Sequence, residues 1–201
     1  MNIHKIVNSV FSSNTYILTN DNSADVWIVD IGDIEPVVDY INSLEGHKSV
    51  KGLLLTHTHF DHIYGINKLI NQYHECEVYT SNYGKEGLFS DKLNNSRYHG
   101  DIIIFKGEHV NIVKEGDNVQ LYENVFAHVY ETPGHDWSCV SYKIGEWLFT
   151  GDSFIPGVPI RAIFRKSNKD QAKESEERIQ NELMKDVSVV YAGHCNPLYL
   201  N

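Results

Sequence analysis

The run of residues 56–62 constrains this chain more than any other part of it. It reads Thr-His-Thr-His-Phe-Asp-His and directly follows the apolar segment Gly-Leu-Leu-Leu at residues 52–55. Three imidazoles and a carboxylate at the end of a predicted buried strand are typical of a metal site. These donors suit zinc, iron and manganese, and the run contains none of the cysteine thiolates that closed structural zinc sites prefer. The run therefore predicts a catalytic metal site.

The spacing of these four donors predicts that they point in two directions. His57 and His59 are two residues apart, so on an extended segment they face the same side. If a helix begins at about His62, Asp61 and His62 face the same place from its first turn, at a different angle. Four donors are more than one tetrahedral ion needs, because a catalytic ion keeps a position open. The surplus favours a second ion.

Length and composition predict one soluble domain covering residues 1–201. The chain has room for one substantial core, and 41% of its residues are hydrophobic and 22% charged. It contains no apolar run near the roughly 18 residues of a membrane span, and its N-terminus does not resemble a secretory signal. We therefore expect a cytoplasmic protein that does not associate with membranes.

The formal net charge of −10 predicts an acidic surface. Nucleic acids are bound by basic patches, so we expect a small-molecule substrate and no nucleic-acid partner. The three cysteines, Cys76, Cys139 and Cys195, form no Cys-x-x-Cys pair. They are read as reduced thiols, with no assigned role for Cys139 or Cys195.

Hydrophobic periodicity predicts two blocks of strands, each followed by helices. In the first block we expect strands at residues 3–11, 14–18, 26–31, 50–55 and 77–80, and helices at 35–44 and 63–73. Residues 81–106 lack periodicity and predict a helix-and-loop insert that covers the site. In the second block we expect strands at residues 110–113, 119–121, 125–131, 139–143, 147–150 and 187–191, and a polar helix at 169–185. This order predicts an α+β fold, a four-layer αββα sandwich of two mixed β-sheets with helices on the outer faces.

Three further predicted strand ends carry a possible ligand beside a glycine. They are Thr132-Pro133-Gly134-His135, Thr150-Gly151-Asp152-Ser153 and Ala192-Gly193-His194. Glycine lets the backbone turn sharply and approach an ion closely. We therefore expect His135, Asp152 and His194 to converge with the first cluster at one edge of the fold.

The ordered set of His57-x-His59-x-Asp61-His62, His135, Asp152 and His194 resembles the metallo-β-lactamase superfamily, and within it the glyoxalase II-like group. The resemblance covers all five metal-binding motifs over nearly the whole chain. It implies two divalent metal ions, with zinc as the first expectation and iron or manganese as alternatives. The ligands that it implies are His57, His59 and His135 for the first ion, Asp61, His62 and His194 for the second, and Asp152 between them.

The resemblance also implies an activity. A water held between two divalent ions supplies hydroxide near neutral pH, so we expect a hydrolase that cleaves an ester, thioester or lactone bond of a small molecule. Asp61 and Asp152 are the catalytic candidates. The motifs are shared by enzymes with many substrates, so they predict the reaction class and leave the substrate and the oligomeric state open.

Two other functions are compatible with this pattern. Persulfide dioxygenases resemble glyoxalase II but use one iron, held by residues matching His57, Asp152 and either His135 or His59. A metal-binding regulatory domain without catalysis is the other alternative. Arg161 occupies a place comparable to that of an arginine that supports the site in glyoxalase II-like relatives, and a solvated arginine is the competing interpretation.

Overall fold

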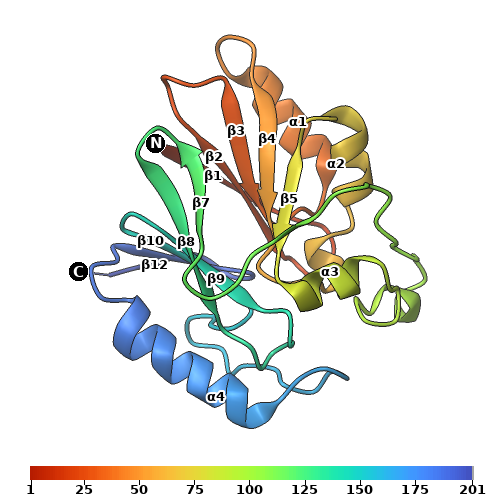
Figure 1. Ribbon diagram of the computed structural model, residues 1–201, viewed down its shortest axis with the longest axis vertical. Coiled ribbons are helices and arrows are strands. Elements are labelled where there is room, and N and C mark those ends of the chain that lie inside the picture. The colour runs from red at the N-terminus through yellow and green to blue at the C-terminus, as the bar shows by residue number, and fades with distance from the viewer. Residues whose placement is uncertain (201) are drawn as a thin grey trace.

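Two six-stranded β-sheets pack face to face in the computed structural model, which describes residues 1–200 (Figure 1). The first sheet has the order β1-β2-β3-β4-β5-β6, with β1 (Asn2–Val7), β2 (Asn14–Thr19), β3 (Asp25–Val29), β4 (Ser49–Leu54), β5 (Glu77–Thr80) and β6 (Asn111–Ile112). The second has the order β12-β11-β10-β9-β8-β7, with β7 (Asn118–Tyr122), β8 (Val125–Glu131), β9 (Val140–Ile144), β10 (Trp147–Gly151), β11 (Val189–Ala192) and β12 (Leu198–Tyr199). Both sheets are mixed: β3 to β6 run parallel in the first, and β10 and β11 run parallel in the second.

Helices cover the outer faces of the two sheets. Helices α1 (Ile34–Ser43) and α2 (Ile66–Gln72) lie on the first sheet, and α4 (Lys169–Arg178) lies on the second (Figure 1). A shorter helix, α3 (Asn82–Leu88), belongs to the segment between β5 and β6. The predicted αββα sandwich is therefore confirmed. None of the helices in residues 1–200 is long and apolar enough to cross a membrane.

Alternation along β3 explains how one strand supports two layers. Trp27 and Val29 pack in the core between the sheets, whereas Val26 and Ile28 pack in the core under α1 and α2. Successive side chains of a strand point to opposite faces, so a strand buried on both sides is apolar throughout. Burial on both faces fixes the register of this strand, because a slip of one residue exchanges the two faces.

The structure differs from the sequence predictions mainly at element ends. The first strand stops at Val7 rather than at residue 11, because Phe11 and Ser12 adopt left-handed φ values of 52° and 55° in the turn to β2. The second predicted helix begins at Ile66 instead of residue 63. Residues 110–113 contribute only the two-residue β6, which pairs with β5 in the first sheet. The polar helix passes into a π-helical turn, Ile179–Leu183, and the strand at 187–191 is observed at Val189–Ala192.

Candidate metal centre

All seven predicted ligands lie at one edge of the sandwich. His135, Asp152 and His194 follow the carboxyl ends of β8, β10 and β11, which run in the same direction in the second sheet. The His57 to His62 cluster follows the carboxyl end of β4 in the first sheet. Backbone hydrogen bonds join the two sheets here, including Val140 N to Thr56 O at 2.8 Å and Asn14 N to Gly193 O at 2.7 Å. The strand ends therefore bring together residues that lie far apart in the sequence.

Three of these residues form a first ligand set. The ligand atoms of His57, His59 and His135 lie within 4.8 Å of one another, and all three side chains are buried. His59 Nδ1 and His135 Nε2 are 3.0 Å apart. Ring nitrogens that approach this closely point at a common position, and a metal ion at that position would be bound by all three.

Asp61, His62 and His194 form a second set. Asp61 Oδ2 lies 3.6 Å from His62 Nε2 and 3.4 Å from His194 Nε2. Asp61 and His62 belong to a 3₁₀ turn, Phe60–His62, that precedes α2. The helix expected to begin at about His62 is this 3₁₀ turn, and α2 begins only at Ile66. The turn aims both side chains at the same place.

Asp152 faces both sets. Its Oδ2 lies 3.5 Å from His135 Nε2 of the first set and 3.5 Å from His194 Nε2 of the second. Its Oδ1 lies 3.6 Å from His62 Nε2. One carboxylate placed between the two histidine sets has the position of a bridging ligand.

Unpaired buried atoms test whether these residues fit metal ions. His57 Nε2, His62 Nε2 and Asp152 Oδ1 are buried and have no hydrogen-bond partner within residues 1–200. Leaving buried polar atoms unpaired costs about 1–3 kcal/mol each, so native proteins rarely do it without a compensating ligand. Nitrogen and oxygen atoms of this kind are the donors that zinc, iron and manganese accept. The residues fit the predicted ions.

The opposite ring nitrogens are held by partners outside the two sets. His62 Nδ1 lies 2.9 Å from Asp30 Oδ2, and His135 Nδ1 donates to the backbone carbonyl of Arg161 at 2.9 Å. His57 Nδ1 lies 3.2 Å from Thr56 Oγ1. A metal-binding histidine is usually oriented by such a bond from its second nitrogen, which leaves the other lone pair free for the ion.

Asp30 was missed by the sequence analysis. It follows β3 at a left-handed φ of 54° and is 2% exposed. Besides His62, it accepts hydrogen bonds from Thr56 N at 2.8 Å and Thr56 Oγ1 at 2.7 Å. These bonds occupy both carboxylate oxygens, so Asp30 acts as a support for His62. A signal was present, because Asp30 is an acidic residue that directly follows the buried, apolar strand β3.

Arg161 contacts the site through its backbone, and neither Cys139 nor Cys195 is a possible metal ligand in residues 1–200. Arg161 supports His135 through its backbone carbonyl, and the residue is otherwise exposed. Cys139 is buried and Cys195 is exposed with a φ of 65°. Neither cysteine belongs to a possible metal-ligand group in residues 1–200.

The two sets differ in electrostatics. Burial lowers the pKa of His57 and takes that of His135 to about 4, so both rings are neutral. Burial has the same tendency at His62 and His194, but the facing carboxylates of Asp61 and Asp152 outweigh it and raise these pKa values to about 9 and about 10. Without a metal, the second set is therefore an ion-paired network, whereas His57 and His135 of the first set are neutral imidazoles.

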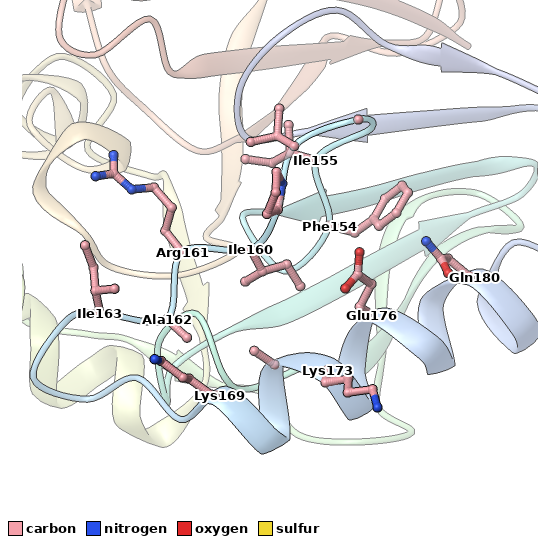
Figure 2. Close-up of a pocket in the computed structure, with 14 residues that line it drawn as sticks. Phe154, Ile155, Ile160, Arg161, Ala162, Ile163, Lys169, Lys173, Glu176 and Gln180 are labelled. Carbon is pink, nitrogen blue, oxygen red and sulfur yellow. The ribbon is translucent and has the colours of Figure 1, made fainter.

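The loop between β10 and α4 borders both the site and a cavity. The Phe164 ring packs on His59 and His135, with centroid distances of 4.6 and 5.3 Å. The same loop and one face of α4 enclose a cavity of about 830 Å³, with apolar side chains such as Phe154 and Ile160 on one side and Glu176 on the other (Figure 2). This volume is within the range of small-molecule sites. The loop that shields the first set thus also forms a wall of the cavity.

The insert between β5 and β6 contacts the same side of the site. Ser81 Oγ donates to the carbonyl of Ser138 at 2.8 Å, and the Tyr83 ring stacks on Trp137 with a centroid distance of 4.3 Å. Phe60 N donates to the carbonyl of Asn94 at 2.9 Å. The insert therefore contacts the segment after His135 and the turn that carries Asp61 and His62.

Comparison with known proteins gives the family. The family model of the metallo-beta-lactamase superfamily matches residues 10–194. A probable metallo-hydrolase of Streptococcus pyogenes is 34% identical over 161 residues, which are 77% of this chain and 67% of that protein. A hydroxyacylglutathione hydrolase of Hydrogenovibrio crunogenus is 29% identical over 182 residues, which are 90% of this chain and 58% of that protein. The chain belongs to the metallo-beta-lactamase superfamily.

Solved structures support the fold. The BLEG-1 B3 metallo-beta-lactamase superposes with a TM-score of 0.86 at 24% identity, covering 98% of this chain and 94% of that one. At this level of identity the similarity concerns the fold alone.

Proposed function

We propose that this protein is a binuclear metallo-hydrolase that cleaves an ester, thioester or lactone bond of a small molecule. The observation that carries the proposal is the position of Asp152. Its Oδ2 lies 3.5 Å from a histidine nitrogen of each ligand set. A shared carboxylate between two sets is what a two-ion site requires.

The proposed ligands are chosen from the distances between their donor atoms. His57, His59 and His135 would hold one ion, and Asp61, His62 and His194 the other, with Asp152 shared. Two divalent ions held in this way supply a water acidified to a nucleophile and a Lewis acid for the carbonyl oxygen. Zinc is our first choice, and iron and manganese suit the same donors.

Side-chain exposure indicates where the substrate approaches. The His62 side chain is fully buried, whereas the side chains of Asp61 and Asp152 are 10% exposed and that of His194 is 20% exposed. The open side of the centre is therefore formed by its carboxylates and His194. We assign to Asp61 the orientation of the nucleophile and proton transfer to the leaving group, because it combines this exposure with a position in the second set.

The type of bond is proposed from chemistry and from a relative. The hydroxyacylglutathione hydrolase named above acts, by its name, on an acyl derivative, and an acyl carbonyl is the group that a Lewis acid and an acidified water attack. The chain spans 58% of the length of that relative, so the proposal carries over the acyl bond and not glutathione. With a formal charge of −10, the chain remains a poor candidate for binding nucleic acid.

The second ligand set favours hydrolysis over the one-iron dioxygenase. A single iron needs only three residues around His57, yet Asp61, His62 and His194 form a further complete group. His62 Nε2, which is buried and unpaired, points into that group. The proposed two-ion hydrolase uses this group to hold its second ion.

A reconstitution screen tests the proposal. Metal-free protein would be loaded with zinc, iron or manganese, its metal content measured, and hydrolysis followed for thioesters, lactones, esters and phosphodiesters. We expect about two ions per chain and turnover of an acyl substrate. One iron per chain together with oxygen uptake on a persulfide would establish the dioxygenase instead, and two ions without any turnover would favour the regulatory role.

A further inference from the structure

We propose that Asp136 is a positioning residue for the first ion, which orients His59 and fixes the ring nitrogen that carries its proton. The inference rests on the proposed metal centre. Asp136 directly follows His135 in the chain and is 3% exposed. It does not belong to either ligand set.

His59 differs from the other histidines of the first set in the nitrogen that it presents. His59 points Nδ1 into the site, 3.0 Å from His135 Nε2, whereas His57 and His135 present Nε2 and engage Nδ1 elsewhere. For Nδ1 to offer a lone pair to an ion, the proton of the neutral ring must be on Nε2. A buried N–H at that position needs an acceptor.

Asp136 is the acceptor that the fold provides. Its Oδ2 lies 3.5 Å from His59 Nε2, which has no tighter hydrogen-bond partner within residues 1–200. No Lys or Arg nitrogen in that range lies within 4.0 Å of the Asp136 carboxylate, so its charge is not neutralised by another side chain. The 3.5 Å separation is longer than an ordinary hydrogen bond, and hydrogen bonds of this kind are often long before a site is loaded and tighten afterwards.

The other oxygen of Asp136 is already engaged. Its Oδ1 accepts from Ser138 N at 2.9 Å and from Ser138 Oγ. The backbone carbonyl of Asp136 accepts from Gly134 N and Cys139 N at 3.2 and 3.3 Å. The carboxylate is therefore held by one oxygen with the other directed at His59, so its orientation is fixed before an ion binds.

The surroundings exclude water from this pair. The Phe164 ring packs on His59 at 4.6 Å, and Trp137, the residue after Asp136, lies between the Tyr83 ring and Lys166 Nζ, which is 3.7 Å from the Trp137 ring centroid. An interaction between a charge and an N–H is stronger in such a low-dielectric site than in water. The pair is therefore suited to fix the ring, since solvent offers little alternative.

An asparagine at position 136 reverses the hydrogen-bond pattern. Ser138 N and Ser138 Oγ are both donors, so they keep bonding the oxygen of the asparagine amide. The amide NH₂ group then faces His59 Nε2. A donor at this position favours a lone pair on Nε2 and moves the proton to Nδ1, where it blocks the ion. Alanine removes the acceptor without placing a donor there. A positioning role thus predicts that Asp136→Asn binds the metal more weakly than Asp136→Ala does. A purely structural role predicts the reverse, because asparagine preserves the shape of the side chain.

Metal affinity and the His59 proton position test the proposal together. Zinc and cobalt would be titrated against a competing chelator for wild type, Asp136→Asn, Asp136→Ala and Ser138→Ala, and ring ¹⁵N shifts would locate the His59 proton in the metal-free proteins. We expect Asp136→Asn to weaken the binding of one ion about 10- to 100-fold and to move the His59 proton to Nδ1. The alanine variant at 136 should lose less. Ser138→Ala keeps the carboxylate and its bond from the Ser138 backbone N–H, so it should lose less affinity than either Asp136 variant.

Other results would overturn the assignment. Asp136→Asn with wild-type affinity and its proton on Nε2 contradicts it, and so does an alanine variant that binds more weakly than the asparagine variant. If the alanine variant does not fold, the wild-type and asparagine proteins still decide the matter through the proton position. No substrate enters these measurements, so a failure to find hydrolysis would count against the proposed function without affecting the Asp136 result.

Discussion

The substitution Gly193→Ala probes how precisely Asp152 must be placed. Gly193 precedes His194 and follows β11, and a Cβ built on it would lie 2.2 Å from Asp152 Oδ1 and 2.8 Å from His62 Cε1. Carbon and oxygen atoms in contact need about 3.5 Å, so Asp152 must move by about 1.3 Å, or the backbone must shift. The third neighbour, at 3.0 Å, is the backbone carbon of Gly151, which leaves little room for the backbone to yield.

The expected loss follows from this displacement. Overpacking of this kind costs about 1–3 kcal/mol of folding stability, and a misplacement of about 1 Å in a catalytic centre costs about 100-fold in rate. Because Asp152 faces both ligand sets, the bound metal should fall below two ions per chain. The assay is metal content, hydrolysis rate and the free energy of unfolding, measured on the same preparation.

A glycine elsewhere supplies the control. Gly145 has a φ of 58°, and a Cβ added to it would meet no atom within 4 Å, so alanine there introduces backbone strain without a clash. We expect Gly145→Ala to lose about 1–2 kcal/mol of stability and to keep its metal and activity. A Gly193→Ala protein with two ions and wild-type turnover would refute the idea that the position of Asp152 defines the centre.

Four further results are expected. Asp152→Ala should lower metal content and hydrolysis together, and full metal with full turnover would contradict its shared role. Asp30→Asn should weaken the binding of one ion about 10- to 100-fold in a chelator competition, because the variant loses the acceptor for His62 Nδ1 at 2.9 Å. Asp33→Asn is the control: it loses bonds to Ser9 and Tyr64 and should bind both ions as the wild type does. Loading the metal-free protein near neutral pH should release about two protons, because His62 and His194 have pKa values of about 9 and about 10 and must lose a proton to bind an ion. Calorimetry in buffers of different ionisation enthalpy measures the release, and no release would show that both rings are neutral. Because these pKa values are raised from 6.5, their stabilisation of the metal-free protein is complete below that pH, and the unfolding free energy should fall as pH rises through about 9 to 10.

Local patterns predicted most of the fold. The apolar segment of β3 and the spacing of Val37 and Ile41 in α1 each reflect the period of one element, which a short stretch of sequence contains. Most errors lie at element ends, where the turn before α2 and the left-handed Phe11 depend on contacts with other segments. The placement of residues 110–113 in the second block was also wrong, because β6 pairs with β5 in the first sheet. Periodicity carries no information about those contacts.

The same division applies to the metal centre. The sequence by itself determined which donors are present and that each follows a strand, because ligand type and strand period are local properties. Only the tertiary structure decided which donors share a position and which partner holds each ring, as with Asp30 on His62 and Asp136 near His59. Those relations arise because β3 pairs with β4 in one sheet and the ends of β8, β10 and β11 meet that edge from the other. Long-range strand pairing and the packing of the two sheets set them, and neither has a local signature in the chain.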